Sequence, residues 1–412
     1  MHPMNQPAFL HKFSNLALGG LNLRPGQCLA VKAEPENIDV AVMVSTLAYR
    51  RGARYVDIWT ESSRMLRSRV DNSEGEHLEY LPEYRQHRNR EFIRDKWALL
   101  SIKSPVDPTV MDGANAARSG AIARVESVAD AELRRALSND LTQWSVMAVP
   151  SEKWAAAVLE MPADGEALRR MWEAMVPILR LDRENPVQFW NEYGLELEKR
   201  ARVLTDLRIR KLRFADGETD LTVGVGPGAL WKGGGAYTKE GVRFAPNLPT
   251  EEVFTTPDYR LTEGRAVMSR PVRVYGQLLR GAWMEFRGGK VVGHGAESGG
   301  DALEAFLDVD SGSRSMGEIA LVDSGSPLFQ SGLLFHNILL DENAACHFAL
   351  GFAYPTCISG GAAMSDAQLD EQGANRSRQH LDFMIGSDRT RVTATLSDGT
   401  EKVIMEEGRF TL

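Results

Sequence analysis

Two histidines and three carboxylates in the carboxyl-terminal half of the chain are of the types that bind divalent metal ions. His347, His380 and Asp382 lie late in the sequence, and Glu252 and Glu318 precede them. Imidazole nitrogen and carboxylate oxygen are the ligands that zinc and other first-row divalent ions take in proteins. These residues therefore predict a metal site.

The spacing His380-Leu381-Asp382 fits a strand that presents both polar side chains on one face, because side chains two positions apart in a strand point the same way. The apolar run from Phe383 to Ile385 follows and should carry the segment into a core. A buried histidine and aspartate need partners. Convergence on one ion would satisfy both, and so would a simple His–Asp hydrogen bond, which the pair alone leaves open.

Two glutamates upstream lie in segments where an acid is unusual. Glu318 is inside the apolar run Gly317–Val322, and glutamate is almost never fully buried without a partner. Glu251 and Glu252 are adjacent, and neighbouring carboxylates repel each other unless a positive charge lies nearby. One of them could bind metal while the other acts as general base on the reacting water. The alternative is an exposed turn with two solvated acids.

His347 and Tyr354 belong to a stretch rich in small residues, Asn343–Tyr354, which allows a backbone or a ligand to approach closely. The phenol of Tyr354 could ligate a metal or donate a hydrogen bond to a developing oxyanion. A core histidine and a packed tyrosine are the alternatives that the residues leave open.

The first half of the chain alternates strand-like and helix-like segments. A helical pattern covers Asn37–Arg51, and the predicted strands are Cys28–Val31, Tyr55–Trp59, Trp97–Ile102 and Val146–Val149. Strands that alternate with helices predict an α/β domain with a mostly parallel sheet flanked by helices. The turns lack both glycine patterns that cradle phosphate, GxGxxG and GxxxxGK[ST], so we expect no nucleotide site here.

A helix is predicted to begin at Asn185-Pro186 and to run to Leu207. The residues after this helix have a different pattern of apolar and glycine residues. Short alternating segments separated by glycine-rich turns follow, together with a helix at Gly300–Asp308. The segments are Lys211–Phe214, Asp220–Val225, Ala266–Val274, Gln277–Arg287 and Arg391–Leu396. They predict an α+β, largely antiparallel domain. We expect two domains, an access or scaffold domain at 1–205 and a catalytic, metal-binding domain at 206–412.

Composition limits the partners. A chain of 412 residues exceeds what one core usually supports, and its net charge of −8 disfavours nucleic acid or an anionic membrane. Met1–Phe13 has no apolar run of signal-peptide length, and no segment approaches twenty unbroken apolar residues. The three cysteines form no disulfide framework and no CxxC zinc motif. We expect a cytoplasmic protein.

The sequence resembles the thermophilic-type metallo-aminopeptidases, the family of aminopeptidases T and S, over almost its whole length. The resemblance rests on four stretches in the same order. They are Asn247–Pro257, Gly317-Glu318, Glu342-Asn343-Ala344 through His347 to Tyr354, and Asn375-Arg376-Ser377 through His380-Leu381-Asp382 to Ser387. Similar amino-terminal stretches include Leu23–Gln27 and Trp144–Pro150.

The resemblance implies a two-domain enzyme, usually a homodimer, that removes amino-terminal residues from peptides with water activated by two divalent ions. Zinc, cobalt, manganese or magnesium would serve. Carried over residue by residue, the metal positions are Glu252, Glu318, His347, Tyr354, His380 and Asp382. Glu318 would bridge the ions. Glu251 is the candidate general base, and Tyr354 would also help to hold the oxyanion.

Two other functions remain open on this scaffold. Ring-cleaving dioxygenases of dihydroxypyridine degradation share the fold with a mononuclear iron(II) site, and His347, His380 and Asp382 alone would make a two-histidine, one-carboxylate triad. Glu252, Glu318 and Tyr354 would then be surplus. A non-catalytic binding protein is the third possibility.

Overall fold

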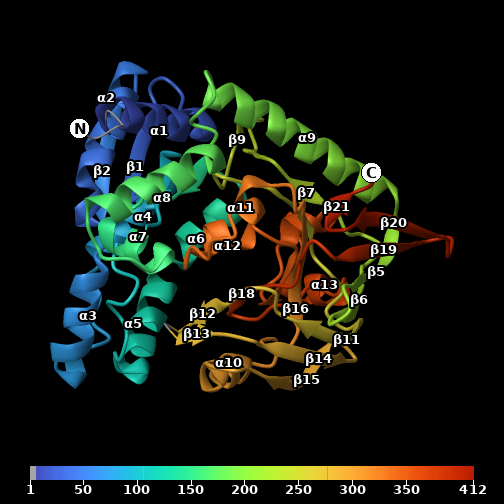
Figure 1. The fold of residues 1–412 in the computed structure, drawn as a ribbon. Helices are drawn as coiled ribbons and strands as arrows, with labels where there is room; N and C mark the ends of the chain where they lie inside the picture. The colour runs from blue at the N-terminus through green and yellow to red at the C-terminus, as the bar shows by residue number, and fades with distance from the viewer. Residues whose placement is uncertain (1–5, 105, 276) are drawn as a thin grey trace. The chain divides into compact units, whose positions relative to one another are not determined.

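The computed structural model describes residues 6–104, 106–275 and 277–412, and the chain forms two compact units (Figure 1). The first contains the residues up to Glu192 together with Gly235–Pro249, and the second contains Tyr193–Gly234 and Thr250–Leu412. Residues 1–5 of the amino-terminal segment considered above lie outside the described residues. Among the described helices, none has the length and apolar character needed to cross a membrane.

The first unit is an α/β structure, as predicted. Its parallel sheet has the order β2-β1-β3-β4. The strands are β1 (Cys28–Ala33), β2 (Tyr55–Thr60), β3 (Ala98–Ile102) and β4 (Trp144–Met147), and a small antiparallel pair is formed by β8 (Ala236–Tyr237) and β9 (Arg243–Phe244). The helices are α1 (Gln6–Leu21), α2 (Ile38–Arg50), α3 (Ser63–Asn72), α4 (Tyr84–Arg94), α5 (Ala116–Ala129), α6 (Ala131–Ser138), α7 (Glu152–Leu159) and α8 (Gly165–Ile178).

Helices flank this sheet because its side chains are apolar on both faces. Phe92 of α4 and Leu133 of α6 pack against Ala30, Trp59 and Leu99 from three of the strands. Helices α1 and α2 pack against each other and against strands of the sheet. All five residues of β3 are buried, which is the pattern of a central parallel strand.

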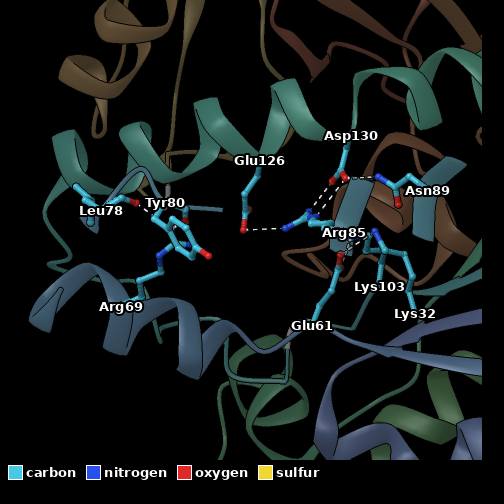
Figure 2. A network of polar contacts seen from close by, with 10 residues as sticks. All are labelled: Lys32, Glu61, Arg69, Leu78, Tyr80, Arg85, Asn89, Lys103, Glu126 and Asp130. Carbon is cyan, nitrogen blue, oxygen red and sulfur yellow. Dashed lines mark hydrogen bonds and ion pairs between the residues drawn. The ribbon is translucent and has the colours of Figure 1, made fainter. Parts of the chain in front are cut away.

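Charged side chains gather at the carboxyl end of the sheet (Figure 2). Lys32 lies near the end of β1, and Glu61 and Lys103 directly follow β2 and β3. The Glu61 carboxylate lies 2.7 Å from the Lys32 ammonium and 3.3 Å from that of Lys103. In the same network, Arg85 pairs with Glu126 and Asp130. Each of these lysines, arginines and acids therefore has a partner of opposite sign, whereas Arg69 donates to the backbone carbonyls of Leu78 and Tyr80.

Helix α9 (Pro186–Asp206) begins as predicted, with the Asn185 side chain accepting a hydrogen bond of 3.1 Å from the backbone N–H of Gln188. The second unit contains an eight-stranded antiparallel sheet of order β15-β14-β11-β6-β5-β19-β20-β21. Its strands are β5 (Ile209–Ala215), β6 (Asp220–Gly224), β11 (Thr262–Val267), β14 (Trp283–Arg287), β15 (Lys290–Gly295), β19 (Arg391–Leu396), β20 (Glu401–Glu406) and β21 (Arg409–Phe410).

A five-stranded sheet of order β18-β17-β16-β10-β7 completes the second unit, with a hairpin of β12 (Val272–Val274) and β13 (Gln277–Leu279). Its strands are β7 (Lys232–Gly233), β10 (Glu252–Thr255), β16 (Met316–Val322), β17 (His347–Gly351) and β18 (His380–Met384). The helices are α10 (Gly300–Leu307), α11 (Pro327–Gln330), α12 (Ile338–Glu342) and α13 (Asp366–Glu371). The predicted α+β, largely antiparallel class is confirmed.

Two predicted strands of this region were wrong in extent. Ala266–Val274 is divided, because β11 ends at Val267 and β12 begins only after Pro271, a residue that cannot donate to a strand ladder. Gln277–Arg287 is divided by a turn at Gly281, whose φ is +56°. Both segments looked continuous because their apolar residues keep the same alternation across the turn.

Candidate metal centre

The five-stranded sheet places Glu318 and Asp382 side by side. Glu318 on β16 pairs with Ala349 on β17, and Ala349 pairs with Asp382 on β18. Directly paired residues of antiparallel strands project from the same face of a sheet. The two carboxylates therefore point to the same side, with only the methyl group of Ala349 between their strands.

The remaining metal-type ligands project from that face as well. His347 and His380 each lie two positions before the β17 and β18 members of this row, so their side chains point the same way. Glu252, at the start of β10, pairs with Val322, which lies an even number of positions along β16 from Glu318. Four neighbouring strands thus bring five ligands together above one sheet face.

The opposite face of the same strands is mostly apolar, with Thr255 of β10 as a polar member. Ile319, Leu321, Phe348, Leu350 and Phe383 are all buried in the main core of the second unit. This alternation explains why the glutamate at 318 stands in an apolar sequence run. One face of the strand builds the core, and the other presents ligands.

Among the described residues, the side chains form two groups with metal-ligand spacing. The first contains Glu252, Glu318 and His347, and the second contains Glu318, His380 and Asp382. Glu318 belongs to both. Within each group the candidate ligand atoms all lie within 4.8 Å of one another. A single glutamate therefore joins two three-ligand sets.

The separations within the groups fit ligands that share an ion. Nε2 of His347 lies 3.2 Å from Oε2 of Glu252. Nε2 of His380 lies 3.4 Å from Oε2 of Glu318 and 3.4 Å from Oδ1 of Asp382. Two ligand atoms about 2.1 Å from one zinc ion at a tetrahedral angle are about 3.4 Å apart. The spacing is thus that of a coordination shell.

Both histidines are oriented by a backbone carbonyl. Nδ1 of His347 is 3.0 Å from the carbonyl oxygen of Ala345, and Nδ1 of His380 is 2.8 Å from that of Phe352. A proton donated from Nδ1 leaves the Nε2 lone pair directed at the carboxylates, which is the usual arrangement of metal-ligating histidine. Oε2 of Glu252 is buried and accepts no hydrogen bond from a described residue. A cation between these lone pairs would satisfy both, so the donor set fits divalent metal.

Electrostatics at the site also favour a cation. Burial raises the pKa of Glu318, and the charges of Glu252 and Asp382 raise it further, against the opposing effect of His380. Burial alone would lower the pKa of His347, but the surrounding carboxylates, Glu252 first, raise it to about 10. The carboxylates thus repel one another and bind any positive charge that the site can take up.

Tyr354 lies beside the second group. Its ring centroid is 5.2 Å from that of His380, and its ring also contacts Phe254 and Phe352 edge-on. The charge of His380 lowers the pKa of Tyr354, but burial and the charges of Glu318 and Asp382 outweigh it and raise the pKa. The phenol therefore keeps its proton at neutral pH and can donate a hydrogen bond.

Glu251 lies outside the two groups and is held by its own contacts. The hydroxyl of Tyr193 donates a hydrogen bond of 2.6 Å to Oε2 of Glu251. The backbone N–H of Glu251 donates to Oδ1 of Asn343 over 2.7 Å. The Nδ2 group of Asn343, which is fully buried, donates to the carbonyl of Leu339 over 2.9 Å. Asn343 thereby ties the start of β10 to α12.

Sequence reasoning missed Glu342 as a member of the site. It is the last residue of α12, which packs beside β18. Burial and the neighbouring carboxylates, Asp382 first and then Glu252, raise its pKa well above the usual value. Burial raises the pKa of Asp382, but the charges of His380 and then His347 outweigh it and lower the pKa. Glu342 opens one of the stretches that carry the resemblance, but its position at a helix end gave no periodic signal.

The cysteines play no visible part in this chemistry. Cys346 and Cys357 are buried, Cys28 is partly buried, and all three are free thiols. The thiol of Cys346 faces the carbonyl of Val322 on the core side of the sheet. Cys346 and Cys357 thus behave as small core residues.

An α/β unit joined to an antiparallel unit, with two mostly buried carboxylate–imidazole groups that share a glutamate, has the features of a metal-dependent hydrolase. The chain belongs to the thermophilic metalloprotease family M29, whose model matches residues 8–410. This result confirms the family that the sequence resembles.

Several characterised proteins are similar over nearly the full length. Aminopeptidase T of Thermus aquaticus is 35% identical over 404 residues, covering 98% of both chains. Aminopeptidase 2 of Geobacillus stearothermophilus is 35% identical over 402 residues, covering 97% of both. The solved structure of wild-type AmpT from Thermus thermophilus superposes with a TM-score of 0.91 at 33% identity, covering 98% of this chain and 100% of that one.

Proposed function

We propose that this protein is a metal-dependent aminopeptidase that hydrolyses the first peptide bond of peptides with a free amino terminus. Membership of the metalloprotease family supports a hydrolase that uses divalent metal. The similar proteins named as aminopeptidases support the peptide substrate and the choice of its amino end. The observation that carries the proposal is the pair of ligand groups that share Glu318.

We further propose that the site holds two divalent ions, with zinc, cobalt, manganese and magnesium as candidates. Glu252, Glu318 and His347 would hold one ion, Glu318, His380 and Asp382 would hold the other, and Tyr354 stands beside the second set. When bound, such ions act as Lewis acids on the scissile carbonyl and lower the pKa of water. The carbonyls of Ala345 and Phe352 keep the two imidazoles in the orientation that this binding needs.

The chain's own groups would handle the proton and the developing charge. Glu251 is the proposed general base, which takes a proton from the attacking water and passes it to the leaving amine. The hydroxyl of Tyr193 orients its carboxylate. Tyr354, protonated because of its raised pKa, would donate a hydrogen bond to the oxyanion of the tetrahedral intermediate.

The dioxygenase alternative receives no support from the arrangement of the ligands. It needs His347, His380 and Asp382 around one iron(II). In the described part of the chain the two histidines fall into different groups, each completed by glutamate. Glu252 and Glu318, which an iron triad would not need, are members of these groups. A non-catalytic binding role would not account for this cluster of buried acids.

A chelation experiment tests the proposal. Treatment with a chelator should abolish hydrolysis of unblocked aminoacyl-p-nitroanilides, and added zinc, cobalt or manganese should restore it. The matched substrate is the same compound with an acetylated amino group, which should not be cleaved. Equal rates on the two substrates would refute the exopeptidase assignment. The cytoplasmic location and the homodimer stay predictions from the sequence.

A further inference from the structure

Arg376 has two hydrogen-bond donors that no group of the described chain uses. Its Nη2 atom donates to the carboxylate of Asp366 over 2.6 Å. Its Nε and Nη1 atoms are buried, and neither has an acceptor among the described residues. Buried donors in folded proteins nearly always have an acceptor. Two orphaned donors on one guanidinium therefore indicate a partner that the chain itself does not supply.

The ion pair between Arg376 and Asp366 is exposed. Asp366 begins α13, and its side chain is 80% exposed, whereas that of Arg376 is 28% exposed. An ion pair with such an exposed partner contributes little to stability, because water screens it. The contact therefore holds the guanidinium loosely, and the side chain can rotate to bring its unused N–H groups to an incoming acceptor.

A row of aromatic rings connects Arg376 with the metal centre. The ring centroid of Tyr354 lies 5.2 Å from that of His380, 6.0 Å from that of Phe254 and 5.9 Å from that of Phe352. The guanidinium carbon of Arg376 lies 5.0 Å from the centroid of the Phe352 ring. All five side chains are partly exposed. The guanidinium is thus two ring contacts from a ligand of the second group, a span that a few residues of extended peptide cover.

The chemistry of a peptide substrate fits this row. A peptide held by its amino end at the ligand groups presents acceptor oxygens on the carboxyl side of the scissile bond. These oxygens belong to the next carbonyl group or, in a dipeptide, to the terminal carboxylate. A guanidinium has five N–H donors and no acceptor, so it is complementary to both.

We propose that Arg376 binds the carbonyl or carboxylate oxygen that follows the scissile bond and so favours peptides over substrates whose leaving group has no acceptor. This inference rests on the proposed aminopeptidase function. Hydrogen bonds from a charged donor are stronger than those from a neutral one, so loss of this contact should lower the preference for peptides about 10- to 100-fold.

Three substrates isolate the contact. Leu-Gly carries a carboxylate after the scissile bond, Leu-Gly-NH2 carries a neutral carbonyl group, and leucine 2-naphthylamide carries no oxygen there. Arg376→Met keeps the apolar stem and removes the donors. It should lower the ratio of kcat/KM for each peptide to that for the naphthylamide about 10- to 100-fold. Arg376→Lys, which keeps the charge, should recover part of this ratio.

The matched control is Arg378→Met, because Arg378 lies in the same segment and is exposed. It should leave both ratios unchanged, and all variants should bind as much metal as the wild type. A greater loss on Leu-Gly than on Leu-Gly-NH2 would identify the carboxylate as the partner, and equal losses on the two peptides would identify the carbonyl oxygen.

Two results would overturn the proposal. Equal losses of kcat/KM on all three substrates would show that Arg376 only supports the structure of the site. Unchanged ratios in Arg376→Met would show that its donors do not meet the substrate. Failure of the aminopeptidase assignment itself would instead appear as a wild-type enzyme that cleaves none of the three substrates.

Discussion

Replacement of Glu318 by glutamine tests the shared-ligand geometry directly. Glutamine has the shape of glutamate but lacks the charge, and Glu318 is common to both ligand groups. Loss of an outer-shell partner already costs a metal site about 10- to 100-fold in affinity. Loss of a direct ligand should weaken the binding of each ion at least 100-fold, which corresponds to about 2.7 kcal/mol of binding free energy per ion. Both ions together would then bind about 10⁴-fold more weakly.

The same substitution should have opposite effects on stability with and without metal. With a chelator present, Glu318→Gln should melt at the same temperature as the wild type or higher, because the raised pKa of Glu318 marks a charge that burial disfavours. With metal at about 100 times its dissociation constant, the wild type should gain about 2.7 kcal/mol per ion. For a unit of about 200 residues, this gain corresponds to a rise of roughly 5–10 °C per ion.

Calorimetric melting, metal analysis and turnover would be measured on the same samples. The matched control is Glu304→Gln, since Glu304 also pairs with a histidine, His294, at 2.6 Å but lies half exposed and outside both groups. It should keep two ions per chain and full turnover, whereas Glu318→Gln should lose at least one ion and about 10³-fold or more in turnover. Wild-type metal content near one ion per chain in excess zinc or cobalt, with full activity, would refute the shared-ligand reasoning.

Three further predictions concern the supporting structure. Asn343→Ala should lower the unfolding free energy by about 1–3 kcal/mol in urea titrations, because it leaves the buried N–H of Glu251 without its acceptor. The control Gln372→Ala, at an exposed position, should change the unfolding free energy little. Equal effects of the two substitutions would contradict the connection between β10 and α12. Burial raises the pKa of Glu61, but Lys103 and Lys32 lower it to about 2, so its ion pairs stabilise the first unit above about pH 4.5 and lose that effect as the pH falls towards 2. Glu61→Gln should therefore cost about 1 kcal/mol at pH 7, a value reduced by the 44% exposure of the side chain, and nothing near pH 2; a cost independent of pH would rule out the charge as its origin. Titration calorimetry of the intact protein with ATP or NAD should give no binding heat, because the turn after β1 carries Glu34 and Glu36 in place of a glycine-rich phosphate cradle, and micromolar binding would contradict this.

The four parallel strands and one helix of the first unit followed from local patterns, although β4 spans Trp144–Met147 where Val146–Val149 was predicted. The helix predicted at Asn37–Arg51 is α2, which is one residue shorter at each end. The predicted strand Cys28–Val31 extends two residues further, to Ala33, because its parallel neighbours β2 and β3 continue the ladder there. Such extensions depend on partners far away in sequence, so no local pattern can contain them.

The ligand types were also predictable, but their division into two groups was not. The H-x-D spacing correctly placed His380 and Asp382 on one face of a strand. That His347 joins Glu252, and not His380, depends on the register of β10, β16 and β17. Register is set by pairing across the whole sheet. Glu342 escaped notice for a related reason, since only the position of α12 beside β18 brings it to the site.

The distribution of ligands over β10, β16, β17 and β18 has a consequence for how the protein matures. Glu252 and Asp382 are 130 positions apart, so the full ligand set exists only after strands distant in sequence have found one another. Contacts of this range close large loops and form slowly. A nascent or partly folded chain therefore cannot assemble both ligand groups, and we expect proteolytic competence only when the sheet is complete. Metal uptake would thus report the end of folding, and a misregistered chain would remain an inactive protease.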